Sequence, residues 1–383
     1  MGTRVIGCGK ALPQRVVSND EMSTIVDTND EWIRTRTGIG NRHVAIEETT
    51  TDLGAAAARR AMGWDAGGWR LDGETIDPES IDLLVCMTIT PDKVVPSQAA
   101  LLKARLGLPN AVAFDLNAAC AGCIYGLDVA SDKLELSAYD RERAGEGGRR
   151  TRNDMKRALV IGSERLTRLT DWTDRSTCVL FGDGAGAVLL EWQDDEPGII
   201  ASFLKNTDDV DDVLVVANLY DMSTFPFADA KTAYGELSCA GMRADASDEV
   251  VAAMREAGFT EHDDEMGSPF IDMAGQAVFK FATSAMPEAA REVCERAGIT
   301  LDDVKCIVPH QANERIIRYA AKKLGVSEDL FQISIEEVGN TSASSVLMAL
   351  ADAYEAGRIQ TGDNVLLVGF GGGLTAGALL FRA

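Results

Sequence analysis

The chain has 383 residues, of which 46% are hydrophobic and 25% charged, so we expect a globular protein with one or two substantial cores. Sixty acidic residues against 37 basic ones give a formal charge of −23, which argues against nucleic acid as a partner because its phosphates would be repelled. Small molecules, or partners that dock on locally basic patches, are the expected ligands.

The apolar segments and cysteines indicate a cytoplasmic protein without a membrane span. Residues 1–12 contain no apolar block long enough for a signal peptide. The longest uncharged apolar stretch, Val365–Phe381, is too short for a span and carries five glycines, so it predicts two buried strands around a glycine turn. Most of the eight cysteines lie in apolar runs, which is typical of core thiols in a reducing compartment.

The first half of the chain alternates helical and strand patterns. A helix is predicted over Asp52–Met62, before a buried strand that ends the segment Ile76–Val85. A second strand, Ala111–Leu116, leads through a turn into an apolar helix at Ile124–Leu134, and a third strand follows at Ala158–Gly162. This alternation predicts a sheet covered by helices.

The second half repeats this order about 220 residues later. A helix at Phe279–Ala297 precedes a buried strand in Ile299–Val308. A strand at Leu330–Ile335 leads through the turn Gly339–Ser342 into another apolar helix, and a strand follows at Asn364–Gly369. The shared order and spacing indicate that one half duplicates the other.

The duplication predicts an α/β fold of two similar halves, residues 1–195 and 196–383, packed as one compact unit. Each half is expected to close with a glycine-bearing hairpin, at Phe181–Leu190 and Gly369–Leu380. Two segments fit neither half and are predicted to be surface insertions, residues 63–75 and the arginine-rich residues 137–155.

Only three histidines are candidates for a general base. His43 and His262 lie in charged segments, where a solvated surface position is expected. His310 follows the predicted buried strand Val304–Val308, at the carboxyl end where α/β sheets bind ligands. A histidine that packs in the core or caps a helix is the alternative interpretation.

Cys120 lies between a predicted strand and a predicted helix, where the helix dipole favours a thiolate. Asn340 occupies the corresponding turn of the second half, so we expect Cys120, Asn340 and His310 to share one crevice. A thiol that can carry an acyl group, beside two neutral groups that can bind an oxyanion, is typical of carbon–carbon bond formation.

Cys120 also begins a C-x-x-C motif with Cys123, the spacing of thiol–disulfide oxidoreductases. That function requires a compact domain around a βαβ unit, and it would leave His310, Asn340 and the duplication unexplained. It stays a remote alternative.

Three segments resemble the active-site motifs of β-ketoacyl-acyl carrier protein synthase III, a thiolase-fold condensing enzyme: Asp115–Gly122, Pro309–Arg315 and Gly339–Ser345. The similarity extends to Asp27–Ile39, Phe181–Gly186 and Gly369–Thr375. The resemblance implies a thiolase-like fold in which two βαβαβ-type halves pack as layers in the order α/β/α/β/α.

The resemblance also implies a decarboxylating Claisen condensation that initiates fatty acid synthesis. Cys120 would take the acyl group of an acyl-coenzyme A as a thioester, with the backbone amides of Cys120 and Gly372 as the oxyanion hole. His310 and Asn340 would stabilise the enolate formed from malonyl-acyl carrier protein, which attacks the thioester to give 3-oxoacyl-acyl carrier protein. No metal and no permanently bound cofactor is implied.

For coenzyme A, the resemblance implies that Trp32 and Arg175 hold the adenine between them, with Thr28 and Arg36 nearby, and that Asn313 contacts the pantetheine arm. A structural tryptophan and a surface arginine are the alternative interpretation of the adenine pair.

For the acidic carrier protein, the charge pattern predicts a basic dock beside the site, because Arg315, Arg318 and Lys322 fall on one helix face. Lys280 and Gln311 are the predicted neighbours in this dock. A solvated helix face is the alternative.

The resemblance implies a homodimer in which the residue before Pro96 closes the partner subunit's acyl pocket. Here that residue is Val95, which leaves room for a branched or longer primer; Cys123 and Phe370 are the other expected pocket residues. Alternatively, Val95 only packs in the interface and the other walls set the chain length.

Two related functions stay open at this point. A condensing enzyme or acyltransferase of secondary metabolism could use the same three side chains on another acceptor. A catalytically silent carrier-binding protein on the same fold is disfavoured because all three reactive side chains are present.

Overall fold

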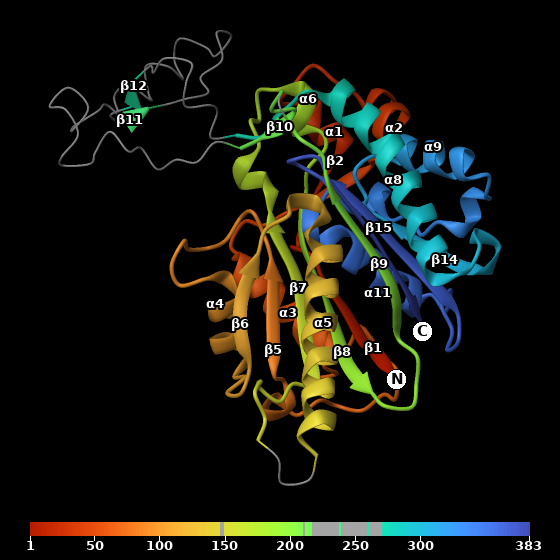
Figure 1. Cartoon of the computed structure of the whole chain (residues 1–383). Helices are drawn as coiled ribbons and strands as arrows, with labels where there is room; N and C mark the ends of the chain where they lie inside the picture. Colours follow the sequence, from red (N-terminus) through yellow and green to blue (C-terminus); the bar gives the residue numbers. More distant parts are fainter. Residues whose placement is uncertain (146–148, 210, 217–236, 239–258, 261–269) are drawn as a thin grey trace, which may run out of the picture.

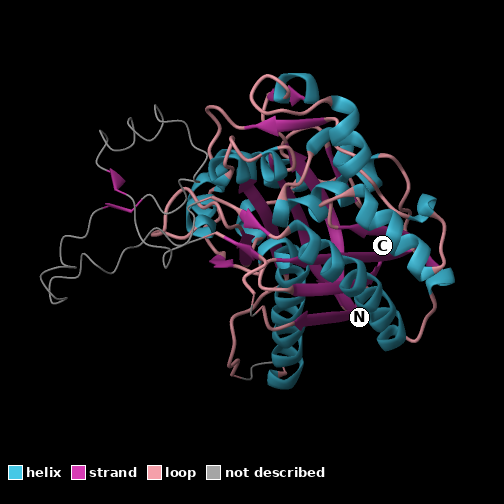
Figure 2. Ribbon diagram, turned by 90° about the horizontal axis from the view of Figure 1, so that it is seen from above, coloured by secondary structure: helices cyan, strands magenta, loops and turns pink. Residues whose placement is uncertain are grey.

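The computed structural model describes residues 1–145, 149–209, 211–216, 237–238, 259–260 and 270–383. In this part of the chain, two sheets and three sets of helices form five layers (Figure 1). Seen from above, helices lie on both sides of the strands (Figure 2). The layered α/β arrangement predicted from the sequence is therefore confirmed.

The first sheet has six strands in the order β4-β1-β8-β7-β5-β6. The strands β7, β5 and β6 are parallel to one another, whereas β8, β1 and β4 continue the sheet antiparallel to their neighbours. The strands are β1 (Gly2–Ala11), β4 (Gly68–Arg70), β5 (Leu83–Met87), β6 (Val112–Leu116), β7 (Arg157–Arg165) and β8 (Asp183–Gln193).

The second sheet has four strands in the order β14-β15-β16-β9. The pair β14 and β15 is parallel, and β16 pairs antiparallel with both β15 and β9. The strands are β9 (Ile199–Asn206), β14 (Val304–Pro309), β15 (Asn364–Gly371) and β16 (Thr375–Arg382). The apolar stretch predicted as two buried strands around a glycine turn is β15 and β16.

Two helices fill the layer between the sheets. These are α5 (Gly122–Ala144) and α11 (Ser345–Glu355), which contact strands of both sheets. Nine of the eleven residues of α11 are buried, as expected for a helix that is covered on all sides. The turns directly before these two helices carry residues of the candidate site.

Two pairs of helices cover the outer faces. The pair α3 (Thr50–Ala61) and α4 (Gln98–Leu106) covers the first sheet, and the pair α8 (Gly275–Ala297) and α9 (Glu314–Leu324) covers the second. The contact between α3 and β1 requires a glycine, because a Cβ at Gly9 would lie 2.4 Å from the carbonyl oxygen of Ala57. Each outer layer has its own apolar cluster.

Shorter elements complete the described fold. The helices are α1 (Asn19–Met22), α2 (Asp30–Thr37), α6 (Arg175–Cys178) and α10 (Ile335–Val338). The 3-10 helices are η1 (Pro78–Ser80), η2 (Ala119–Ala121), η3 (Leu166–Leu169), η5 (Leu301–Asp303), η6 (Glu328–Leu330) and η7 (Ser342–Ser344). The strands are β2 (Arg15–Ser18), β3 (Asn41–Val44), β10 (Leu214–Val215), β11 (Leu237–Ser238), β12 (Phe259–Thr260) and β13 (Asp272–Met273).

The predicted strand Leu330–Ile335 is wrong. Only Phe331 forms a bridge to β14, at Ile307. The guanidinium of Arg358 donates to the carbonyl oxygen of Phe331, and the side chain of Gln311 accepts hydrogen bonds from two amides of the segment. Backbone groups that a strand would use for pairing are thus taken by side chains.

The first predicted hairpin, Phe181–Leu190, is also wrong, because most of this segment belongs to the single strand β8. Its glycines allow close packing, since a Cβ at Gly186 would lie 2.6 Å from the Cβ of Leu347. The second prediction, Gly369–Leu380, is confirmed as the β15–β16 hairpin, with Gly373 in the left-handed region at φ 67°.

Neither predicted insertion is a plain surface loop. Residues 63–75 contain β4, an edge strand whose Trp69 stacks on Tyr354 of α11 with ring centroids 3.7 Å apart. Residues 137–155 begin with the last turns of α5, where Asp140 is buried and accepts hydrogen bonds from the backbone N–H and the hydroxyl of Thr151. Both segments therefore contribute to the packed structure.

Candidate active site

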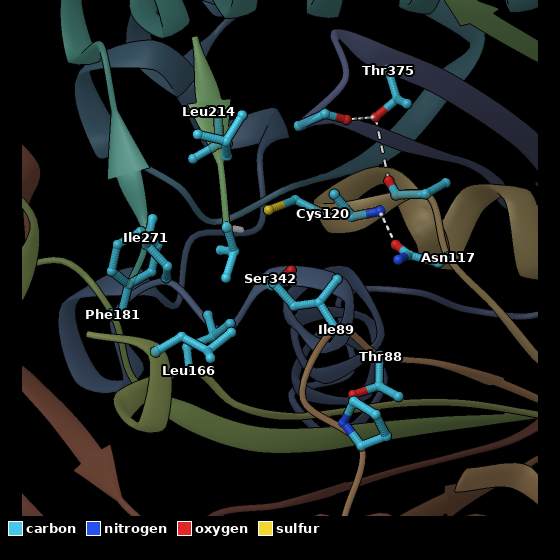
Figure 3. Close-up of a pocket in the computed structure, with 17 residues that line it drawn as sticks. Thr88, Ile89, Asn117, Cys120, Leu166, Phe181, Leu214, Ile271, Ser342 and Thr375 are labelled. Carbon is cyan, nitrogen blue, oxygen red and sulfur yellow. Dashed lines mark hydrogen bonds between the residues drawn. The ribbon is translucent and has the colours of Figure 1, made fainter. Parts of the chain in front are cut away.

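The turns at the carboxyl ends of β6 and β14 and before α11 bring the three predicted reactive residues together. Cys120, His310 and Asn340 all line one small cavity of about 90 Å³. Cys120 also lines a larger pocket of about 930 Å³ beside it (Figure 3). The crevice expected from the duplication therefore exists, and it is built from both halves.

The two halves place the same turn at this crevice. The side-chain oxygen of Asn117 accepts a hydrogen bond of 3.0 Å from the backbone N–H of Ala119, and that of Asn340 accepts one of 2.9 Å from Ser342. Ala119 and Ser342 both adopt left-handed backbone conformations, with φ of 46° and 49°. Non-glycine residues in this region are uncommon and occur often at functional sites.

Cys120 lies in η2, directly before α5, and is 9% exposed. Burial raises the pKa of its thiol to about 11, although the neighbouring Ser342 hydroxyl acts in the opposite direction. Burial therefore acts against the thiolate that the helix terminus is expected to favour. The thiol is protonated at neutral pH, so acylation needs a group that accepts its proton.

His310 follows β14 and is 1% exposed. Its backbone N–H donates to the carbonyl oxygen of Val368, its Nδ1 lies 2.6 Å from the hydroxyl oxygen of Ser345, and its ring packs edge-on against Phe370. Burial lowers the pKa of His310 to about 3, so the imidazole is neutral at physiological pH. A neutral imidazole can donate one hydrogen bond to an oxyanion without adding charge.

Asn340 is fixed by its backbone and by its side-chain oxygen. Its backbone N–H donates to Leu180, and its carbonyl oxygen accepts from Gly182. Because the side-chain oxygen is engaged by Ser342, the Nδ2 group is left as the donor toward the cavity that Asn340 lines. The pair His310 and Asn340 thus offers neutral donors, the kind of groups that stabilise an oxyanion.

The β15–β16 turn lies against the nucleophile. A Cβ at Gly371 would lie 2.6 Å from the backbone nitrogen of Cys120, so only glycine allows this approach. Gly372 lines the larger pocket together with Cys120. This position is compatible with the expected oxyanion hole, which stays a prediction.

The sequence analysis missed Glu164, at the carboxyl end of β7. Its side chain is completely buried and accepts hydrogen bonds from the hydroxyls of Thr88 and Thr90 and from the backbone N–H of Ile89. Burial raises the pKa of its carboxyl to about 7. The available signal was a single acid three residues after the apolar run Ala158–Ile161.

The predicted adenine pair is in direct contact. The guanidinium carbons of Arg36 and Arg175 lie 4.5 and 4.9 Å from the ring centroid of Trp32, and Arg175 also donates to the carbonyl oxygen of Asp27. No aromatic ring fits between a guanidinium and an indole at this separation. Adenine binding between them therefore requires Arg175 to move. The hydroxyl of Thr28 is buried without a hydrogen-bond partner in the described part of the chain.

Asn313 caps α9 and joins it to α2. Its side-chain oxygen accepts from the backbone N–H of Arg315, and its Nδ2 donates to the carbonyl oxygen of Arg36. It also lines the small cavity with His310. A contact to a pantetheine arm would have to share these groups.

One residue of the predicted basic dock does not belong to it. Gln311 is completely buried, and its amide bonds the carbonyl oxygens of Pro309 and Gln332 and the amides of Ser334 and Ile335. A side chain that caps so many internal groups cannot contact a partner. The prediction that Gln311 belongs to the dock is therefore wrong.

The basic residues of the dock are exposed on α8 and α9. Arg315, Lys322 and Lys280 face solvent, with the Arg315 guanidinium over the ring of Phe279. Arg318 differs, because it forms ion pairs with Glu314 and Glu328. Its charge is therefore largely balanced.

The predicted acyl-pocket residues separate. Phe370 lines the small cavity, and Val95 is 83% exposed on its own subunit. Cys123 is completely buried in the central core with Ile124 and Leu127, and it is not among the residues that line these two cavities, so its place as a pocket wall stays a prediction. Large apolar side chains line the larger pocket, among them Ile89, Leu166, Phe181, Leu214 and Ile271 (Figure 3). Leu169 also lines it.

The remaining predictions concern other histidines and cysteines. The Nδ1 of His43 lies 2.6 Å from the carbonyl oxygen of Pro13, so His43 is half-buried and not a fully solvated residue. Among the described residues seven cysteines are free and buried. His262 and Cys239 lie outside the described residues.

Within the described ranges, no group of histidine, cysteine and acidic side chains has an arrangement suited to a metal ion. None of the helices in these ranges combines the length and apolar character that crossing a membrane requires.

Comparisons with known proteins agree with the motifs. Residues 294–383 match the family model described as 3-oxoacyl-[acyl-carrier-protein (ACP)] synthase III C terminal, and residues 150–208 match that of 3-oxoacyl-[acyl-carrier-protein (ACP)] synthase III. A β-ketoacyl-[acyl-carrier-protein] synthase III of Clostridium beijerinckii is 38% identical over 382 residues, which cover 99% of this chain and 98% of that protein.

Solved structures of condensing enzymes are also similar to this chain. The crystal structure of 3-oxoacyl-[acyl-carrier-protein] synthase III from Aquifex aeolicus aligns with a TM-score of 0.78 at 36% identity and covers all of both chains. The priming β-ketosynthase of a polyketide biosynthetic pathway aligns with a TM-score of 0.76 at 34% identity, covering 100% of this chain and 96% of that one.

Proposed function

The chain belongs to the β-ketoacyl-[acyl-carrier-protein] synthase III family, and on this premise we propose that it condenses an acyl-coenzyme A primer with malonyl-acyl carrier protein. The products are 3-oxoacyl-acyl carrier protein, carbon dioxide and free coenzyme A, and the reaction initiates fatty acid synthesis. One observation carries the proposal: a buried thiol and two neutral hydrogen-bond donors line a single cavity.

In the first half-reaction the Cys120 sulfur attacks the thioester carbonyl of acyl-coenzyme A and the coenzyme A thiolate leaves. The backbone N–H groups of Cys120 and Gly372 stabilise the oxyanion, a role supported by the contact between the β15–β16 turn and η2. The thiol proton must leave Cys120 in this step, because burial raises the pKa of the thiol to about 11 and keeps it protonated at neutral pH.

In the second half-reaction malonyl-acyl carrier protein loses carbon dioxide, and the resulting enolate attacks the acyl group on Cys120. His310 and Asn340 donate hydrogen bonds to the enolate oxygen. Both groups are neutral and held rigidly, so they stabilise negative charge that develops in the transition state without a large reorganisation. Loss of carbon dioxide supplies the carbanion, so no strong base is needed.

Coenzyme A is proposed to enter past Trp32 and Arg36, with Arg175 moving aside for the adenine and Thr28 and Asn313 nearby. The buried, unpartnered hydroxyl of Thr28 supports a ligand on this side of the site. The carrier protein is proposed to dock on the basic face formed by Arg315, Lys322 and Lys280.

The protein is proposed to act as a cytoplasmic homodimer without a permanently bound cofactor. The exposed Val95 supports a role at the two-fold interface, where it would close the partner subunit's acyl pocket. The halves 1–195 and 196–383 are proposed to work as one unit, because Cys120 comes from the first and His310 and Asn340 from the second.

Intact-mass measurement tests the proposal. The protein is exposed to a panel of acyl-coenzyme A thioesters, and the mass of one acyl group is expected on the parent but not on Cys120→Ala. Addition of malonyl-acyl carrier protein should then remove that mass and yield 3-oxoacyl-acyl carrier protein. Acylation without any turnover of the malonyl carrier would refute the proposed function.

The similarity to the polyketide priming ketosynthase makes the acceptor a second question. Malonyl-acyl carrier proteins from fatty acid synthesis and small-molecule acceptors are compared at equal concentration. Preference for the small molecules would assign the chain to secondary metabolism instead.

A further inference from the structure

Glu164 has no role in the reaction described so far, although it lies close to the nucleophile. It is completely buried and accepts three hydrogen bonds, from the Thr90 hydroxyl at 2.6 Å, the Thr88 hydroxyl at 3.0 Å and the Ile89 backbone N–H at 3.1 Å. The ion pairs of the described residues do not include it. A buried carboxyl without a cation is costly and is typical of functional sites.

Ser342 connects Glu164 to Cys120. Side chains two residues apart on a strand share a face, so Glu164 points to the same side of β7 as Gly162. A Cβ at Gly162 would lie 2.5 Å from the carbonyl oxygen of Ala343, which places η7 directly on this face. The Ser342 hydroxyl at the start of η7 is therefore beside Glu164.

The same hydroxyl faces the nucleophile. Ser342 and Cys120 line the larger pocket together (Figure 3), and the Ser342 oxygen is buried without a hydrogen bond in the described structure. It lies close enough to both the Cys120 thiol and the Glu164 carboxyl to lower the pKa of each. An unpartnered hydroxyl between a thiol and a carboxyl is suited to pass a proton from one to the other.

Few other charged or titratable groups surround this carboxyl. The Cys86 thiol on β5 is buried and has a pKa that burial and the nearby acids raise. Asp92 is bound to the amides of Thr50 and Thr51 at the start of α3. Arg165 follows Glu164 on β7 and pairs with Asp183 on β8, so both side chains lie on the opposite face of the sheet from Glu164. There Arg165 donates a hydrogen bond to the carbonyl oxygen of Ala45, and Asp183 accepts one from its backbone N–H.

We propose that Glu164 holds the proton of the Cys120 thiol, passed through the Ser342 hydroxyl, while the cysteine carries the acyl group. Glu164 is thus a positioning residue for the proton and does not touch the substrate. The proposal deepens the proposed function, on which its acyl-transfer step rests.

The proton balance closes over one cycle. In acylation the sulfur forms its bond to the acyl carbon, the bond from that carbon to the coenzyme A sulfur breaks, and the thiol proton moves to the Glu164 carboxylate. The departing coenzyme A thiolate takes a proton from water. When the enolate attacks, the carbon–sulfur bond to Cys120 breaks, and the Glu164 carboxyl returns its proton to the cysteine thiolate.

The pKa values of Glu164 and His310 support Glu164 as the group that holds the proton. Because burial raises the pKa of Glu164 to about 7, its carboxyl can both take and return a proton at neutral pH. His310, with a pKa lowered to about 3, is a poor store for a proton.

Alkylation of Cys120 by iodoacetamide tests the relay without any acyl substrate. Its rate is followed by intact mass from pH 5.5 to 9.5. In the parent the alkylation rate should rise in two steps as the pH increases. The first rise is centred near pH 7, where Glu164 becomes a carboxylate, and the second begins at higher pH, as the thiol itself ionises. In Glu164→Gln and in Ser342→Ala the first rise should vanish, and alkylation at pH 7.5 should slow roughly tenfold or more.

Three controls separate the relay from a structural effect. Glu164→Asp keeps a carboxyl and should retain the first rise. Asp140→Asn removes a buried carboxyl at the far end of α5, 20 residues from Cys120, and should leave the profile unchanged. The double variant Glu164→Gln with Ser342→Ala should be no slower than either single variant, because both break one relay.

An unchanged profile in Glu164→Gln would overturn the proposal. Faster alkylation in that variant would also overturn it, because the carboxylate would then only repel the thiolate. If Glu164→Gln does not unfold cooperatively, Ser342→Ala carries the test, since it leaves the three hydrogen bonds of Glu164 in place. A parent that shows the first rise but accepts no acyl-coenzyme A would refute the proposed function and leave the relay intact.

Discussion

The side-chain oxygen of Asn340 accepts a 2.9 Å hydrogen bond from the backbone N–H of Ser342. This bond fixes the amide so that its nitrogen is the free donor at the cavity, and it holds Ser342 in its left-handed conformation. One short turn of the second half thus presents both a donor for an oxyanion and the hydroxyl beside the Cys120 thiol.

Asn340→Asp should separate the two half-reactions. The aspartate can still accept the hydrogen bond from Ser342, but it replaces the neutral donor with a carboxylate that repels an enolate. We expect malonyl decarboxylation to fall about 10²- to 10³-fold, while acylation of Cys120 by acyl-coenzyme A stays within a few-fold of the parent. Release of carbon dioxide and intact mass measure the two steps, and a variant that condenses at the parent rate would contradict the oxyanion role.

His310 and Glu164 should affect stability in opposite directions as pH changes. The pKa of His310 is lowered from 6.5 to about 3, so its contribution to stability is present above pH 6.5 and is lost as pH falls toward 3. The pKa of Glu164 is raised from 4.5 to about 7, so its contribution is present below pH 4.5 and is lost as pH rises toward 7.

Denaturant unfolding of the parent and of His310→Gln and Glu164→Gln from pH 4.5 to 7 measures this. The difference in free energy of unfolding between parent and His310→Gln should fall toward low pH, by up to about 1.4 kcal/mol per pH unit. The difference between parent and Glu164→Gln should fall toward high pH. Two flat differences would mean that neither group has the shifted pKa.

The basic residues of α9 should contribute unequally to binding of the carrier protein. Arg315 and Lys322 form no ion pair with other described residues. Neutralising either one with Arg315→Gln or Lys322→Gln should raise the Michaelis constant for malonyl-acyl carrier protein roughly two- to fivefold, a typical size for one surface charge. Arg318→Gln is the matched control, because Glu314 and Glu328 already balance that charge. Equal increases for acyl-coenzyme A would show that this face does not select the carrier.

Val95 should influence which primer the partner subunit accepts. Val95→Phe fills space, so it should shift the preference toward acetyl-coenzyme A, because forcing a longer chain into a filled pocket costs roughly 1–3 kcal/mol. Val94→Phe adds the same volume at the neighbouring position, which is also exposed on the single subunit at 66%, and should leave the acyl-chain profile unchanged. Light scattering checks that both variants keep the oligomeric state of the parent. An unaltered profile in Val95→Phe would mean that other walls set the chain length.

The sequence predicted the site well where a reactive residue lies between a strand pattern and a helix pattern. Cys120, His310 and Asn340 each follow a strand end or precede a helix, so their meeting at one sheet edge could be expected. The strand Leu330–Ile335 was predicted because it corresponds to Ala111–Leu116 in the repeat, but Arg358 and Gln311 bind its backbone groups. These contacts join residues too distant in sequence for a local pattern to reveal.

Contacts between residues distant in sequence also explain why Gln311 was predicted wrongly and Glu164 was missed. Gln311 follows His310 in a turn, where a polar residue is expected to face solvent, yet four internal hydrogen bonds bury it. Glu164 was missed because its link to Cys120 runs through Ser342 of the other half. The burial of Cys123 depends on which side of α5 faces the core, and the motif does not encode this.

The stacking of Trp69 on Tyr354 has a spectroscopic consequence. The indole belongs to the edge strand of the first sheet and the phenol to the helix between the sheets, with the ring planes 18° apart. Separation of the halves would break this contact and expose an indole that is now partly covered, so the emission of Trp69 reports their packing from inside the molecule. In a variant that keeps Trp69 as its single tryptophan, the fluorescence emission would directly report whether the two halves are packed together.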